Sequence, residues 1–143
     1  MAIYSLGVRT AGASTGTPAW EVRMGATDRG AILEMGVFLA AATASTYGIG
    51  RPAVNGAGGT TPVTFLAEDP GDPAGTMTSI LAGWSTTPTA PANFFRRIGL
   101  PATIATGVIW TFPRGLKIAI STSFVLWNLA ANGVVDAYVV EDE

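Results

Sequence analysis

The sequence contains neither cysteine nor histidine in its 143 residues. These absences exclude disulfides, thiolate chemistry, Ser-His-Asp and Cys-His catalysis, and the usual zinc, copper, haem and iron–sulfur ligand sets. The one lysine, Lys117, is the sole candidate for a Schiff-base amine. A chain of this length can still bury a core without metals or cross-links. We therefore expect one domain, residues 1–143, with no cofactor and no enzymatic activity.

Charge is also scarce, at 13% of residues, and the formal net charge is −2. Nucleic-acid-binding domains carry concentrated basic patches, and here the only adjacent basic pair is Arg96-Arg97. The longest apolar run covers only residues 35–42, whereas a membrane span needs about 20 apolar residues. The first residues lack the basic and apolar segments of a signal peptide. We expect no nucleic-acid partner, no membrane partner and no Sec export, and so sparsely charged a surface favours self-association.

What the sequence does contain is a β pattern, because Pro and Gly punctuate short runs rich in Val, Ile, Thr, Phe and Trp. This pattern predicts an all-β, single-domain jelly roll or β-sandwich of about eight to eleven short antiparallel strands. We expect strands at residues 3–8, 20–26, 31–40, 46–51, 63–66, 76–84, 93–100, 107–112, 116–120, 124–129 and 134–140.

Two features of these strands carry specific expectations. In residues 20–24 apolar and charged side chains alternate, which predicts that Glu21 and Arg23 face water. Residues 113–115, Pro-Arg-Gly, are typical of a tight turn between two strands. The alanine-rich stretch 39–44 also fits a short helical turn, although we favour a strand there.

Several groups of residues could carry chemistry, and each has an ordinary structural explanation. Glu68, Asp69 and Asp72 could bind Ca²⁺, but Asp-Pro and Pro-Gly pairs are typical of exposed turns. Glu21 and Glu34, on neighbouring predicted strands, could act as an acid/base pair, but two such acids are usually solvated.

Aromatic residues suggest binding surfaces. One short stretch combines the residue types enriched at protein interfaces: Phe94, Phe95, Arg96 and Arg97. The alternative is that the phenylalanines pack in the core and the arginines are solvated. We expect the four tryptophans to lie in the core or at an interface rather than on a sugar-binding platform; they are Trp20, Trp84, Trp110 and Trp127.

A resemblance rests on residues 93–100, on Trp110-Thr111-Phe112-Pro113-Arg114-Gly115-Leu116, on Leu126-Trp127-Asn128-Leu129 and on the ending 138–143. In these stretches, and in its opening residues 1–10, the sequence resembles small virion proteins of tailed bacteriophages, especially phages of actinobacterial hosts.

The resemblance implies a capsid decoration (cement) protein, made in the host cytoplasm and located on the capsid exterior. Such proteins form homotrimers that bind the major capsid protein and reinforce the shell. We expect residues 1–10 to form an N-terminal arm or edge strand. Candidate contacts are residues 2–10, which include Ile3 and Tyr4, the glycine-rich loop 55–61, Trp84, and Phe94 to Arg97. We expect deletion of residues 2–10 to weaken shell binding without unfolding the domain. The alternatives are a phage tail or fibre module that binds a host-surface glycan on Trp84 or Trp20, and a carboxylate enzyme.

Overall fold

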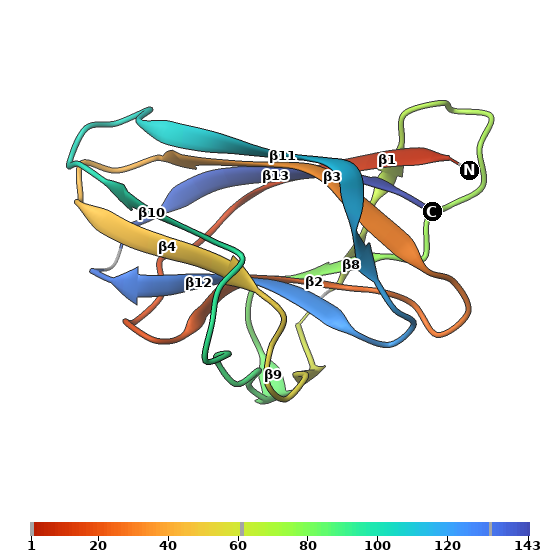
Figure 1. Cartoon of the computed structure of the whole chain (residues 1–143), viewed down its shortest axis with the longest axis horizontal. Coiled ribbons are helices and arrows are strands. Elements are labelled where there is room, and N and C mark those ends of the chain that lie inside the picture. Colours follow the sequence, from red (N-terminus) through yellow and green to blue (C-terminus); the bar gives the residue numbers. More distant parts are fainter. Residues whose placement is uncertain (1, 61, 132) are drawn as a thin grey trace.

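The computed structural model describes residues 2–60, 62–131 and 133–143, and within these ranges all regular elements are β-strands (Figure 1). These residues include no helix capable of crossing a membrane. The strands are β1 (Ile3–Arg9), β2 (Pro18–Arg23), β3 (Gly30–Leu39), β4 (Ser45–Gly50), β5 (Ala57–Gly58), β6 (Val63–Thr64), β7 (Leu66–Ala67), β8 (Thr78–Ile80), β9 (Trp84–Thr86), β10 (Arg96–Leu100), β11 (Gly107–Ile118), β12 (Ser123–Ala130) and β13 (Val135–Asp142).

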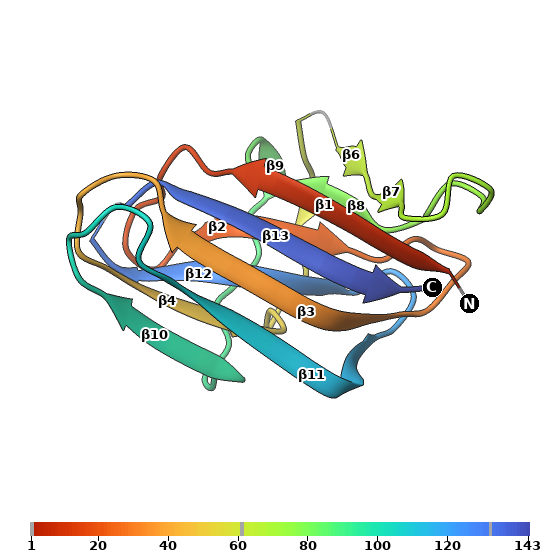
Figure 2. The same ribbon diagram turned by 90° about the horizontal axis from the view of Figure 1, so that it is seen from above.

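Eight of these strands form a jelly roll. Sheet A has the order β11-β3-β13-β1-β7, and sheet B has the order β10-β4-β12-β2-β8-β6. The antiparallel pairs are nested along the chain, because β1 pairs with β13, β2 with β12, β3 with β11 and β4 with β10. Figure 1 shows the two sheets as two layers, and Figure 2 shows β1, β13, β3 and β11 side by side in sheet A. The predicted jelly-roll β-sandwich is therefore confirmed.

The segment between β4 and β10, residues 51–95, is an insertion into this eight-stranded frame. It adds β7 to the β1 side of sheet A and adds β8 and β6 to the β2 side of sheet B. The ribbon of β5 and β9 lies outside sheet B (Figure 1). The insertion thus covers one lateral side of the sandwich and leaves the side formed by β10 and β11 open.

The core lies between the two sheets and contains the largest aromatic side chains. Trp20, Tyr47 and Phe124 belong to this core and are each at most 1% exposed, whereas Trp127, equally buried, lies on the opposite face of β12. The indole of Trp20 donates a hydrogen bond to the Ser79 hydroxyl at 2.7 Å. Burying these rings stabilises the fold, since each removes a large apolar area from water.

Two predictions about individual strands are wrong. Residues 113–115 do not form a turn between two strands, because they lie within the continuous strand β11. The pairing of β11 with β3 shifts register there, between Thr111 and Leu116. The predicted strand 76–84 is instead β8 and β9, with a break between them. The N-terminal segment, expected as an arm or an edge strand, forms a strand: β1 is hydrogen-bonded to β13 over its whole length and to β7 at Tyr4 and Ser5.

Candidate functional site

The open lateral side of the sandwich is the surface with the most distinctive chemistry. Here β10 is the edge strand of sheet B and β11 the edge strand of sheet A. Along β11 only one side is paired, with β3, so the other row of backbone N–H and C=O groups has no strand beside it. Edge strands of this kind are potential pairing sites for other chains.

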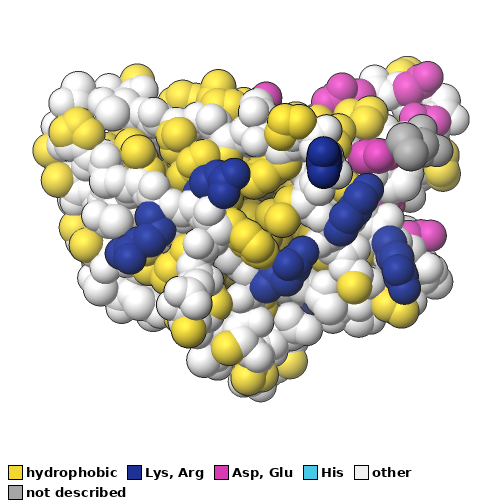
Figure 3. All heavy atoms as spheres, in the orientation of Figure 1, with side chains coloured by type: hydrophobic (Ala, Val, Ile, Leu, Met, Phe, Trp, Pro, Cys, Tyr) yellow, Lys and Arg dark blue, Asp and Glu magenta, His cyan; other side chains and the backbone are white. Residues whose placement is uncertain are grey.

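Most of the positive charge belongs to this side. Six of the eight basic residues lie on β10, on β11 or in the loops next to them: Arg29, Arg51, Arg96, Arg97, Arg114 and Lys117. All six are exposed, and none forms a salt bridge with a described residue; the two salt bridges found use Arg9 and Arg23. We call these six residues the basic side. In Figure 3 the Lys and Arg side chains surround an apolar centre, whereas Asp and Glu gather toward the corner with the chain ends.

Aromatic rings support three of these guanidinium groups. The Arg51 guanidinium lies 5.0 Å from the Phe95 ring centre, that of Arg97 lies 5.8 Å from Phe94, and that of Arg96 lies 5.9 Å from Phe112. Because Arg96 is on β10 and Phe112 on β11, the last contact joins the two sheets across the open side. Cation–π contacts hold these charges in place, and Arg96 is fixed further by donating a hydrogen bond to the Phe95 carbonyl at 2.8 Å.

Glycines in β4 create the space for this aromatic cluster. A Cβ on Gly48 would lie 2.9 Å from the Phe94 ring, and a Cβ on Gly50 would lie 3.5 Å from it. The ring of Phe95 stacks on buried Phe124, with the ring centres 6.2 Å apart, while Phe95 itself stays 38% exposed. Phe95 is therefore an apolar contact point anchored in the core.

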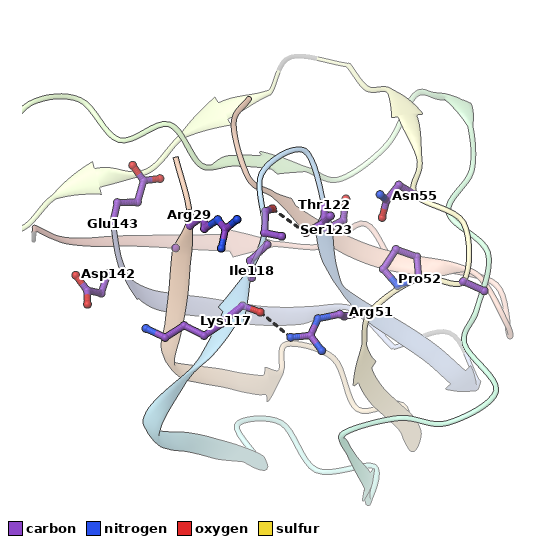
Figure 4. A pocket seen from close by; sticks show the side chains of 13 residues that line it. Arg29, Arg51, Pro52, Asn55, Lys117, Ile118, Thr122, Ser123, Asp142 and Glu143 are labelled. Atoms are coloured by element: carbon purple, nitrogen blue, oxygen red, sulfur yellow. Dashed lines mark hydrogen bonds between the residues drawn. The ribbon is translucent and has the colours of Figure 1, made fainter. Parts of the chain in front are cut away.

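A cleft of about 1020 Å³ opens at one end of the basic side. Its lining includes the starts of β3 and β12, the end of β11 and the residues after β4. Arg29 and Arg51 extend into it from opposite walls, above Ile118 (Figure 4). One amino group of Arg51 donates to the Lys117 carbonyl at 2.6 Å, which fixes its position.

Two acids also line the cleft, Asp142 and Glu143. The Glu143 carboxylate accepts hydrogen bonds from the backbone N–H groups of Thr76, at 2.7 Å, and Met77, at 2.6 Å, so it is already engaged. Cations outnumber acids in the lining, which therefore favours an anionic group.

The seven residues predicted to form an interface do not make one surface. Phe94, Phe95, Arg96 and Arg97 lie together on the open side. Ile3 is half-buried on β1, and Tyr4 is only 2% exposed, with its hydroxyl donating to the Pro73 carbonyl at 3.1 Å. Trp84 is half-buried on β9, outside sheet B.

Glu21 is fully buried, so the prediction that it faces water is wrong. Its carboxylate accepts hydrogen bonds from Arg23, from the Ser123 hydroxyl and from the Trp84 indole. Arg23 also donates to the Gly58 carbonyl at 3.1 Å. The ribbon of β5 and β9 covers this face of sheet B, and the alternation of residues 20–24 could not reveal that cover.

The proposed acid/base pair of Glu21 and Glu34 is also excluded by position. Glu21 is on β2 in sheet B, whereas Glu34 is on β3 in sheet A. The Tyr138 hydroxyl donates to Glu34 at 2.5 Å, and this bond to the carboxylate raises the pKa of Tyr138 to about 12. Neither acid is available to act with the other.

The other candidate residues have structural roles. Trp20 is fully buried, so it cannot serve as a glycan platform. Asp69 closes a turn by accepting from the Gly71 N–H at 2.8 Å, the ordinary role of an aspartate before Pro-Gly. In the described ranges no three acidic side chains converge as a metal site would require.

Sequence reasoning found part of the basic side and missed the rest. The adjacent pair Arg96-Arg97 was visible, but Arg29, Arg51, Arg114 and Lys117 come from other elements, and no spacing connects them. The alternating glycines 48 and 50 in β4 were the available signal that a ring packs against this strand.

The fold and its open side define a jelly-roll β-sandwich with one cationic, aromatic lateral surface. No protein-family model, no curated protein and no solved structure matches the chain.

Proposed function

We propose that the protein is a non-enzymatic structural protein of a phage virion, which forms homotrimers and binds the outer surface of the capsid as a decoration (cement) protein. The observation that supports the proposal is the basic side: exposed arginines on aromatic supports, beside an edge strand with no neighbour. Arg and aromatic residues are the types that dominate binding at protein interfaces.

The edge strand strengthens the case for adhesion. β11 has twelve residues, and the half before Pro113 carries no charge. Ile109 on this half is 51% exposed. Soluble monomers usually protect such an edge with lysines or a short strand. An edge left open beside fixed guanidiniums fits a protein whose partner completes the surface.

Adhesion to a repetitive shell needs only modest contacts in each copy. A trimer that places three basic sides against the shell gains affinity by multivalency, because the second and third contacts form intramolecularly. The major capsid protein is the proposed partner, and acidic groups on its outer surface would pair with the basic residues on and near β11, which are Arg29, Arg51, Arg114 and Lys117.

The test combines solution mass with binding to shells. We expect a species of about 44 kDa, three times the chain mass of 14.7 kDa, by light scattering coupled to size exclusion. We also expect the protein to co-sediment with expanded heads, stripped of decoration, from the phage that carries its gene. Arg114→Ala combined with Lys117→Ala on β11 should weaken that binding at least about tenfold, and Arg9→Ala is the matched control outside the basic side.

Two results would overturn the proposal. A monomer at micromolar concentration that does not sediment with heads would exclude the decoration role. Glycan-array binding that is lost in Trp84→Ala would instead favour the tail or fibre module, because Trp84 is the half-exposed tryptophan named for that function.

A further inference from the structure

A second charged feature of the molecule is a preformed acidic loop, residues 68–73. Its backbone turn is closed by hydrogen bonds from the Gly71 N–H to the Asp69 carboxylate at 2.8 Å and from the Asp72 N–H to the Asp69 carbonyl at 3.0 Å. The loop is tied to β1 at both ends, since the Glu68 N–H donates to Ile3 and the Tyr4 hydroxyl donates to Pro73. It is therefore held in one shape before any partner binds.

Among the described residues, the acids of this loop have no cationic partner. Glu68 and Asp69 are exposed and Asp72 is half-buried, and none of the three forms a salt bridge with a described residue. Leu66, two residues before the loop, is 67% exposed. The loop thus presents carboxylates next to an apolar side chain, the chemical complement of arginines next to Phe95.

The acidic loop and the basic side lie on opposite lateral sides of the sandwich, and Arg96 and Arg97 of the basic side are on β10, the edge strand of sheet B. The loop follows β7 directly, and β7 and β11 are the two edge strands of sheet A. Two complementary surfaces at opposite edges cannot satisfy each other within one chain. They can do so between copies, in a head-to-tail contact that forms a ring if its rotation closes.

We propose that the acidic loop of one copy docks on the basic side of the next copy and that this heterologous contact assembles the oligomer. The inference rests on the self-association in the proposed function and names the surfaces that produce it. Glu68 and Asp72 pair with Arg96 and Arg97, and Leu66 packs near Phe95.

Charge reversal with rescue tests this contact. Glu68→Arg with Asp72→Arg reverses the loop and leaves the turn-forming Asp69 intact; Arg96→Glu with Arg97→Glu reverses the basic side. We expect each pair alone to weaken self-association at least about tenfold, and the combination of all four changes to restore the oligomer. Arg9→Asp with Asp136→Arg is the matched control: it exchanges an exposed salt bridge outside both surfaces and should keep the wild-type mass.

The outcomes separate this contact from the proposed function. If the wild type is an oligomer and both reversed pairs keep its mass, the head-to-tail contact is refuted while self-association stands. If each pair dissociates the oligomer but the fourfold variant, with wild-type circular dichroism, stays monomeric, direct pairing of the two surfaces is refuted. A monomeric wild type refutes self-association itself. Dissociation of the wild-type oligomer in about 1 M salt would support the ionic contact.

Discussion

Glu141 provides a quantitative test of the packing between the sheets. Its side chain is fully buried near the end of β13, and neither carboxylate oxygen has a hydrogen-bond partner among the described residues. A Cβ on Gly30 would lie 3.1 Å from the carboxylate and about as close to the side chains of Met24 and Met77, so the surroundings are largely apolar. Burial, followed by the charge of Glu143, raises the pKa of Glu141 from 4.5 to about 8.

This shift makes stability depend on pH with a definite sign. The unfolded chain ionises Glu141 near pH 4.5, whereas the folded chain keeps it protonated to about pH 8. The free energy of unfolding should therefore fall as pH rises through this window, by about 1.4 kcal/mol per pH unit and at most roughly 5 kcal/mol in total. Below about pH 4.5 Glu141 is protonated in both states and does not lower the free energy of unfolding, whereas above about pH 8 the full loss of stability is present.

We expect Glu141→Gln to remove this dependence, because a neutral amide of similar shape replaces the acid. Urea unfolding between about pH 4 and about pH 9 should show equal stability of the two proteins at the acidic end and a variant more stable by several kcal/mol at the basic end. Glu68→Gln in the exposed loop is the control and should follow the wild type. Parallel stability curves for wild type and Glu141→Gln would refute the assignment of a buried, unpaired carboxyl.

Three further predictions concern folding. Glu21→Gln should lower the free energy of unfolding by about 3 kcal/mol, because it leaves a partly buried guanidinium without its charge partner; urea unfolding measures the loss, and an unchanged midpoint would contradict it. Gly36→Ala should cost about 1–3 kcal/mol, because its Cβ would overlap the Tyr138 ring, whereas a Cβ on Gly7 meets no atom nearer than 4.0 Å; equal thermal midpoints for Gly36→Ala and Gly7→Ala would disprove the overlap. Deleting residues 2–9 should abolish cooperative unfolding, since this removes a strand paired on both sides; a truncated protein with a cooperative melt would show that β1 is dispensable.

The last of these predictions replaces the expectation that residues 2–10 could be deleted without unfolding the domain. In the sequence, residues 2–10 look like a short strand with no assigned partner, and nothing in their pattern distinguishes an arm from an inner strand. The structure places β1 between β13 and β7. Pairing partners far apart in the chain are set by the whole sheet and not by local propensity.

The sequence by itself determined the class of the molecule. Short apolar runs rich in β-branched and aromatic residues, separated by Pro and Gly, specify strands and turns locally, and their number and spacing lead to a jelly roll. The buried positions of alternate residues in β13 follow from the same periodicity. These properties depend on neighbours in the chain, and so they can be predicted from it.

Tertiary structure alone decided where the polar groups lie. Glu21 is buried because the insertion folds back over sheet B, and six basic residues share one side because β10 and β11 are the edges that the insertion leaves open. Neither fact has a local signal, since burial of a charge and convergence of charges depend on contacts between segments far apart in the sequence. The sandwich could be predicted from residue order, whereas its candidate binding surface required the path of the chain in space.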